Sequence, residues 1–273
     1  MIPLITLTTD WGLRDYFTGA LKGALYKAIP GVNIVELSHL VAAYNILQAA
    51  YIVRNAWKNF PDGTIHFIGV DSGTDPDSRL IAVEYHNQVF IGFDCGIFSL
   101  IFEDKPFAIY RLFLDTDFAK IKLVKHLVPL LAELSAGKKL SEAGILTSTF
   151  KELNFFVPAI DDMHIVGHVI YTDEYGNLVT NIEQHVFDFV KADRSFTIQI
   201  KSREYTIKKI SQWYDEVPQG ELLALVNDAG YLEIAVNCGK ASQMFNMKYG
   251  STIRIEFNDN KSSKADHKSF SLS

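Results

Sequence analysis

Apolar residues follow two different spacings in the first half of the chain. Residues 2–8 are mostly apolar and β-prone, which predicts a short buried strand. Residues 16–29 place apolar side chains at helical spacing until Pro30 and Gly31 interrupt them. Similar patterns predict further strands at residues 32–37, 64–70, 80–85 and 88–93, and further helices at residues 44–59 and 123–136. Strands that alternate with helices indicate an α/β domain with a mainly parallel sheet.

The second half of the chain has a different pattern. It holds short β-rich runs without long helical patterns, at residues 164–172, 195–200, 203–207, 222–227, 231–237 and 252–257. We therefore predict an N-terminal α/β domain over residues 1–155 and an all-β, barrel-like domain over residues 164–258. Residues 151–162 are the expected linker. Residues 259–273 are polar and rich in Ser and Lys, so we expect a disordered tail.

Composition narrows the class of protein. The 273 residues are 48% hydrophobic and 21% charged, as in globular domains with a real core. A net charge of −6 argues against nucleic acid as a partner, since phosphate binding needs clustered Lys and Arg. The sequence shows no apolar run of membrane-spanning length and no signal-peptide pattern. Together with two isolated cysteines, Cys95 and Cys238, these features predict a cytoplasmic protein without membrane contact.

The first segment that could carry chemistry is TTDWG at residues 8–12, between the first predicted strand and the first predicted helix. A carboxylate there lies at the carboxyl edge of an open α/β sheet, where such sheets bind ligands. The two oxygens of Asp10 could accept hydrogen bonds from a ribose diol. The alternative is that Asp10 or Asp15 only caps the following helix.

A second acidic loop follows the strand predicted at residues 64–70. It contains Asp71, Asp75, Asp77 and Arg79. Alternating aspartates suit Ca²⁺ or Mg²⁺, but the Glu that completes an EF-hand loop is absent, and we predict no metal site. The alternative interpretation is a polar loop whose aspartates bond to their own backbone.

Two turn segments of the second half contain further candidates. Asp173, Tyr175 and Asn177 follow a predicted strand, where an Asn amide suits an adenine edge and a Tyr ring can stack on the base. A plain β-turn explains the same residues. Asn227 and Asp228 lie between two predicted strands, and a hairpin alone accounts for them.

Taken in order, these segments resemble the SAM hydroxide adenosyltransferase (SAM hydrolase) family, which also contains the SAM-dependent fluorinase and chlorinase. The resemblance covers about residues 4–257. Its motifs are TTDWG at 8–12, the D-x-Y-x-G-x-x-K-G-like run at 15–23, ELSH at 36–39, QAA at 48–50, FPDGT at 60–64, VDSG at 70–73, DEYGNLVTN at 173–181 and GYLEIAVN at 230–237. The motifs that begin at Asp173 and Gly230 are the most specific.

The resemblance implies an α/β domain, a C-terminal β-barrel and a homotrimer whose sites lie between neighbouring subunits. SAM or adenosine would be the small-molecule partner, as a substrate with no further cofactor. Asp10 would bind the ribose hydroxyls, and Tyr175 and Asn177 would bind adenine. The implied contact of Asp173 is the methionine ammonium. Asn227 and Asp228 match the region that meets the methionine carboxylate.

The resemblance also implies a reaction, in which water or hydroxide displaces methionine from the ribose 5′ carbon without a metal. Asp71 matches the Asp of the family's Asp–Arg–His set, and the family Arg falls on Ser78, one residue before Arg79. Lys122 occupies the place of the family His, and His126 lies four residues away. The halogenases have an aromatic residue at position 71, so a halide substrate is not expected.

Two functions therefore follow from the sequence. The first is an S-adenosyl-L-methionine hydrolase that forms adenosine, with Asp71 and Arg79 as the catalytic residues. The alternative is a catalytically weakened SAM- or adenosine-binding protein of the same family, which keeps the nucleoside site without the full catalytic set.

Overall fold

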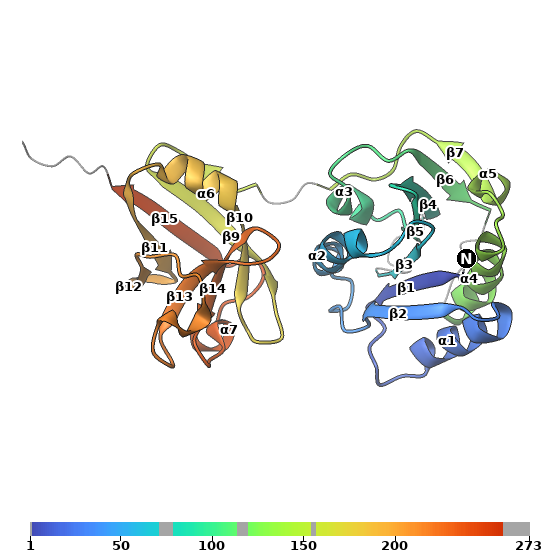
Figure 1. Ribbon diagram of the computed structural model, residues 1–273, viewed down its shortest axis with the longest axis horizontal. Helices are drawn as coiled ribbons and strands as arrows, with labels where there is room; N and C mark the ends of the chain where they lie inside the picture. Colours follow the sequence, from blue (N-terminus) through green and yellow to red (C-terminus); the bar gives the residue numbers. More distant parts are fainter. Residues whose placement is uncertain (1, 71–78, 114–119, 154–156, 259–273) are drawn as a thin grey trace, which may run out of the picture. The chain divides into compact units, whose positions relative to one another are not determined.

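The computed structural model describes residues 2–70, 79–113, 120–153 and 157–258. The chain divides into two compact units, Met1–Phe155 and Phe156–Ser273, and each is described by itself (Figure 1). The tail expected to be disordered, residues 259–273, lies outside the described residues, and so does the middle of the expected linker.

The N-terminal unit is built on a seven-stranded sheet with the order β2-β1-β3-β5-β4-β6-β7. Its strands are β1 (Leu4–Thr9), β2 (Asn33–Ser38), β3 (Ile65–Gly69), β4 (Leu80–Tyr85), β5 (Gln88–Phe93), β6 (Ala108–Leu112) and β7 (Gly144–Thr147). Four strands that are neighbours in the sheet, β2, β1, β3 and β5, pair in parallel. In contrast, β4 pairs antiparallel with β5 and with β6, and β6 pairs antiparallel with β7. The α/β class is confirmed, but the sheet is mixed and not mainly parallel.

The change of direction comes from the hairpin that joins β4 to β5. His86 and Asn87 form its two-residue turn, with φ of 47° and 58°. Positive φ at both positions is typical of a type I′ turn, whose twist matches that of two antiparallel strands. The sequence predicts these two strands, but their tight turn makes the pair antiparallel and reverses β4.

Helices cover both faces of this sheet (Figure 1). They are α1 (Phe17–Ala28), α2 (Ile46–Ala56), the 3₁₀ helix η1 (Trp57–Asn59), α3 (Ile97–Ile101), α4 (Lys120–Ser135) and α5 (Leu140–Ala143). Leu21 of α1 and Leu131 of α4 share one apolar cluster with Leu7. Val53 of α2 and Phe98 of α3 belong to a second cluster. The unit therefore has three layers, with the sheet between two cores.

The C-terminal unit is an antiparallel sheet with the order β12-β11-β15-β9-β10-β14-β13, and β8 pairs beside β9. Its elements are β8 (Ala159–Ile160), β9 (His164–Thr172), β10 (Leu178–Glu183), α6 (Gln184–Lys191), β11 (Ser195–Ile200), β12 (Ser202–Ile207), the 3₁₀ helix η2 (Tyr214–Glu216), β13 (Leu222–Val226), β14 (Tyr231–Val236), α7 (Ala241–Met244) and β15 (Thr252–Asn258). A bridge between Ile210 and Ala224 links the segment after β12 to β13. The sheet is thus nearly closed, as expected for a barrel-like domain, and the described part of this unit adds two short α-helices and one 3₁₀ helix that the sequence did not predict.

Candidate functional site

Asp10 follows β1 at the carboxyl edge of the parallel strands. The side chain is half-buried, and Oδ2 accepts a hydrogen bond from the Tyr44 backbone N–H at 2.9 Å. Tyr44 lies in the loop between β2 and α2. Parallel neighbours β1 and β2 end at the same edge of the sheet, so their two loops meet there.

His39 fixes the backbone on either side of Asp10. The Thr9 hydroxyl lies 2.7 Å from Nδ1 of His39, and the Gly12 N–H donates to the His39 carbonyl at 2.8 Å. Burial lowers the pKa of His39, and the nearby Glu36 carboxylate opposes that shift. Sequence reasoning matched His39 to a motif but gave it no role, whereas the structure makes it the anchor of the Asp10 loop.

The helix-capping alternative for Asp10 and Asp15 is wrong. The N-cap of α1 is Tyr16, and no side chain caps this helix. Asp15 is exposed, and Asp10 bonds to the loop before α2. The helix start thus leaves the Asp10 carboxylate at the sheet edge.

The predicted catalytic residues are placed only in part. Asp71 lies outside the described residues, as do Asp75 and Asp77. Arg79 is exposed directly before β4, and its carbonyl accepts the Asp94 N–H at 2.8 Å. Because the start of β4 pairs with the end of β5, Arg79 lies at the same sheet edge as Asp94. His126 is exposed on α4, and the side chain of Lys122 is outside the described residues.

Asp94 is a polar residue of this edge that the sequence analysis missed. It follows β5 directly, and its Oδ1 accepts the Lys151 N–H at 2.7 Å. Burial raises the pKa of this carboxyl, while the bond from Lys151 lowers it. An aspartate directly after a buried strand was the available signal, as it was for Asp10.

The C-terminal unit contains a cavity of about 790 Å³ that is lined by both predicted adenine-binding residues, Tyr175 and Asn177. Its lining comprises Glu174, Tyr175, Asn177, Tyr214, Val236, Asn237, Cys238, Gly239 and Lys240. The Tyr175 side chain is 75% exposed, whereas Asn177 is 4% exposed. An exposed ring beside a fixed amide is a suitable arrangement for stacking on a flat base and bonding to its edge.

Asp173 holds Asn177 in place. Oδ1 of Asp173 accepts the Asn177 backbone N–H at 2.8 Å, and Oδ2 accepts its side-chain Nδ2 at 3.0 Å. The Gly176 N–H closes the turn on the Asp173 carbonyl at 3.0 Å. The turn interpretation of this segment is therefore confirmed, and the same turn presents Tyr175 and Asn177 to the cavity.

Asn227 shapes the hairpin turn between β13 and β14. Its Oδ1 accepts the backbone N–H groups of Ala229 and Tyr231, both at 3.1 Å. Its Nδ2 donates to the Glu233 carboxylate at 3.3 Å. The predicted hairpin is confirmed, and the Asn227 amide serves mainly to hold the turn that carries Asp228.

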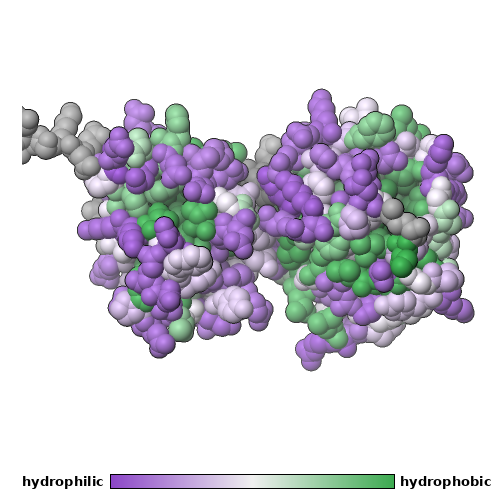
Figure 2. All heavy atoms as spheres, viewed as in Figure 1, coloured by the Kyte–Doolittle hydropathy of each residue, from purple (hydrophilic) through white to green (hydrophobic). Residues whose placement is uncertain are grey.

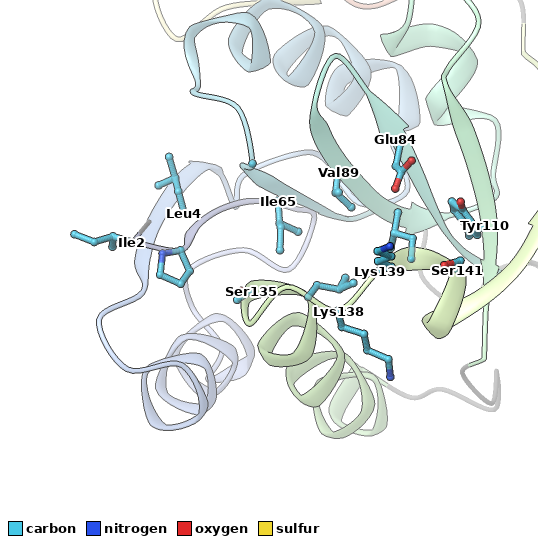
Figure 3. Close-up of a pocket in the computed structure, with 14 residues that line it drawn as sticks. Ile2, Leu4, Ile65, Glu84, Val89, Tyr110, Ser135, Lys138, Lys139 and Ser141 are labelled. Atoms are coloured by element: carbon cyan, nitrogen blue, oxygen red, sulfur yellow. The ribbon is translucent and has the colours of Figure 1, made fainter.

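A second cavity lies in the N-terminal unit, at the opposite edge of the sheet from Asp10. It measures about 350 Å³, and Figure 3 shows apolar side chains such as Ile65 and Val89 beside Lys138 and Lys139. It contains none of the predicted site residues. Among the described residues, no group of three His, Cys, Asp or Glu side chains is placed to hold a metal ion. In the same part of the chain, no helix is long and apolar enough to cross a membrane.

These features define a class of two-unit protein, with an aspartate loop at the edge of an α/β sheet and an aromatic and amide cavity on a nearly closed, barrel-like antiparallel sheet. The chain belongs to the SAM hydroxide adenosyltransferase family. The family's N-terminal domain matches residues 5–144, and its C-terminal domain matches residues 167–254.

Individual relatives agree with this assignment. The chain is similar to the (R)-S-adenosyl-L-methionine hydrolase of Methanocaldococcus jannaschii, at 26% identity over 93% of this chain and 96% of the relative. The protein of that name from Thermus thermophilus is 26% identical over 93% of this chain and all of the relative. A crystal structure of an uncharacterized conserved protein from Thermotoga maritima matches with a TM-score of 0.80 and 27% identity, over 93% of this chain and 99% of that one.

Proposed function

We propose that this protein is an S-adenosyl-L-methionine hydrolase that forms adenosine and methionine, and that it acts on the (R) epimer at sulfur. The observation that carries the proposal is that each of the two family domains presents a candidate half-site. One is the Asp10 carboxylate at the sheet edge, and the other is the cavity with Tyr175 and Asn177. The names of relatives that cover 93% of the chain support both the substrate and its epimer.

The proposed reaction is a displacement at the ribose 5′ carbon. An oxygen of water forms a bond to that carbon as the carbon–sulfur bond breaks, and the electron pair of that bond neutralises the sulfonium. Adenosine, methionine and one proton are the products. Since the sulfonium is already a good leaving group, the protein's task is to align water with the carbon–sulfur bond and to exclude bulk solvent.

We assign Asp71 and Arg79 to the alignment of this water. In the proposed complex Asp10 binds the ribose diol, whose two hydroxyls can both donate to a carboxylate. Tyr175 stacks on adenine, and Asn177 bonds to its edge. Asp173, fixed by its bonds to Asn177, attracts the methionine ammonium.

The turn with Asn227 and Asp228 faces the amino-acid end of the substrate in this proposal. Asp228 would repel the methionine carboxylate unless a cation lies between them, so we assign Asp228 to the ammonium side.

We further propose a homotrimer in which the N-terminal domain of one subunit and the C-terminal domain of its neighbour complete each site. Exposed apolar side chains near both half-sites support this arrangement. They are Leu13, Tyr16, Leu40 and Tyr44 around the Asp10 loop, and Tyr175 and Trp213 beside the cavity. Figure 2 shows apolar residues at the surface of both units. Surfaces of this kind are typical of protein interfaces.

The test is a turnover assay with separated (R) and (S) epimers, in which chromatography follows adenosine and methionine. We expect wild-type protein to release both products from the (R) epimer. Asp10→Ala is expected to lose about 100-fold in kcat/KM, roughly the effect of two charge-assisted hydrogen bonds. Glu142→Ala removes an exposed carboxylate of α5 that belongs to no family motif, and as the control it should keep full activity. Calorimetric binding of SAM without release of adenosine would instead identify the weakened binding protein.

A further inference from the structure

Glu233 is a buried carboxylate on the outer face of the barrel sheet. Successive residues of β14 face opposite sides of the sheet, and Leu232 and Ile234 belong to the barrel core. Glu233 therefore faces the other side, where it pairs across the strands with Leu225 and is 3% exposed. A carboxylate in such a place is destabilising unless hydrogen bonds compensate it.

Two donors supply those hydrogen bonds. The Tyr214 hydroxyl of η2 donates to Oε1 at 2.8 Å, and the Asn227 amide donates to Oε2 at 3.3 Å. Burial raises the pKa of Glu233, and the two hydrogen bonds lower it; the carboxylates of Asp173 and Asp228 raise it further. Burial also raises the pKa of Tyr214, and the hydrogen bond to Glu233 raises it further. The phenol therefore keeps the proton that it donates.

Both partners of Glu233 belong to the site proposed above. Tyr214 lines the cavity that contains Tyr175 and Asn177. Asn227 holds the turn that carries Asp228, through its bonds to the Ala229 and Tyr231 backbone. One buried side chain thus connects a wall of the base cavity to the turn assigned to the amino-acid end of the substrate.

We propose that Glu233 is a positioning residue for substrate binding. The buried Glu233 carboxylate holds Tyr214 in the cavity wall and Asn227 in its turn through two hydrogen bonds. Glu233 thereby sets the affinity for the nucleoside without contacting the nucleoside. The inference rests on the proposed function, because that function assigns the cavity and the turn to one substrate.

Stability measurements separate this role from a purely structural one. A glutamate whose folded pKa exceeds its unfolded value reduces stability once pH rises above the unfolded pKa, since ionisation is harder in the folded state. Glu233→Gln keeps the size of the side chain and removes the charge. We therefore expect the variant to be at least as stable as wild type at pH 7.5 and yet to bind substrate more weakly. If Glu233 had a purely structural role, Glu233→Gln would be less stable than wild type but would bind substrate with unchanged affinity.

The experiment measures Kd for SAM and for adenosine by calorimetry, and kcat for adenosine release. The proteins are wild type, Glu233→Gln, Tyr214→Phe and the double variant. We expect each single variant to raise Kd about tenfold, and the double variant to do little more, because the residues act through one network. The change in kcat should stay within about twofold, since neither residue meets the 5′ carbon. Glu256→Gln, in β15 and paired with Arg254, is the matched control.

Two results would overturn the inference. One is a Glu233→Gln variant whose Kd values equal those of wild type, and the other is a double variant in which the two effects simply add. A wild-type protein that binds ligand without releasing adenosine contradicts the proposed function alone, and the Kd comparison then still decides the role of Glu233. A wild-type protein that binds neither ligand contradicts both.

Discussion

Two histidines of the N-terminal unit lie buried against threonine hydroxyls of β1. Nδ1 of His66 is 2.7 Å from the Thr6 hydroxyl, and its Nε2 is 2.5 Å from Oε1 of Gln88. His39 bonds to Thr9 in the same way, next to the Asp10 loop. Burial lowers the pKa of both rings, that of His66 to about 4. His66 is therefore neutral near pH 7 and serves the fold through its hydrogen bonds.

Because the His66 imidazole is buried and neutral, we predict that the N-terminal unit is less stable at acidic pH. The ordinary pKa of 6.5 holds in the unfolded chain and a value of about 4 in the folded one, so the unfolded state binds the proton first as pH falls. The free energy of unfolding should fall by about 3 kcal/mol between pH 7 and pH 4 through His66 alone. Urea denaturation at several pH values measures it. His66→Gln, which cannot titrate, should remove that part of the slope, and an unchanged slope would contradict the assignment.

At the residue scale, sequence reasoning recognised side chains that end a strand or lie in a turn. Asp10, Tyr175 and Asn177 are of this kind, because their polar or aromatic character stands out in a loop. Sequence reasoning did not recognise Tyr214 and Glu233 as site residues. Tyr214 lies in an irregular segment without periodicity, and a sequence pattern does not indicate which strand such a segment covers. A signal for Glu233 was present, since a carboxylate between Leu232 and Ile234 in an apolar strand requires a buried partner.

At the scale of single elements, α6 ends in a strained conformation. Its C-cap is Ala192, whose φ of 45° lies in the region that favours glycine. Ala192→Gly should therefore raise the free energy of unfolding by about 1 kcal/mol, as glycine relieves the strain at this position. Ala132→Gly inside α4 is the matched control and should lower stability by about 1 kcal/mol, because glycine is a poor helix former. Thermal denaturation of the two variants should show shifts of opposite sign.

Several elements with regular periodicity were predicted well, whereas two short strands and the direction of β4 were not. The predicted bounds of β9 and β11 agree with the structure, since alternation along these strands is regular. The strands β6 and β7 at the edge of the first sheet were missed because few of their side chains are buried. The direction of β4 depends on the turn at His86 and Asn87, which apolar spacing does not describe.

At the scale of the whole molecule, the proposed trimer makes a prediction that a site within one subunit does not. If Asp10 of one subunit and Tyr175 of its neighbour serve the same substrate, Asp10→Ala and Tyr175→Ala subunits are each inactive alone but complement each other when mixed. In a random mixture, about a quarter of the sites would combine an intact Asp10 loop with an intact cavity.

Co-expression of the two variants with different tags, followed by tandem purification, gives mixed oligomers for the adenosine assay. We expect them to recover about a third of wild-type activity, since tandem purification removes both unmixed trimers and every mixed trimer has one intact site among its three. A mixture of Asp10→Ala with Asp173→Ala should recover a similar share, because Asp173 lies in the same unit as Tyr175 and bonds to Asn177, which lines the cavity. Mixed oligomers as inactive as their parents would place both half-sites within a single chain and remove the intersubunit arrangement.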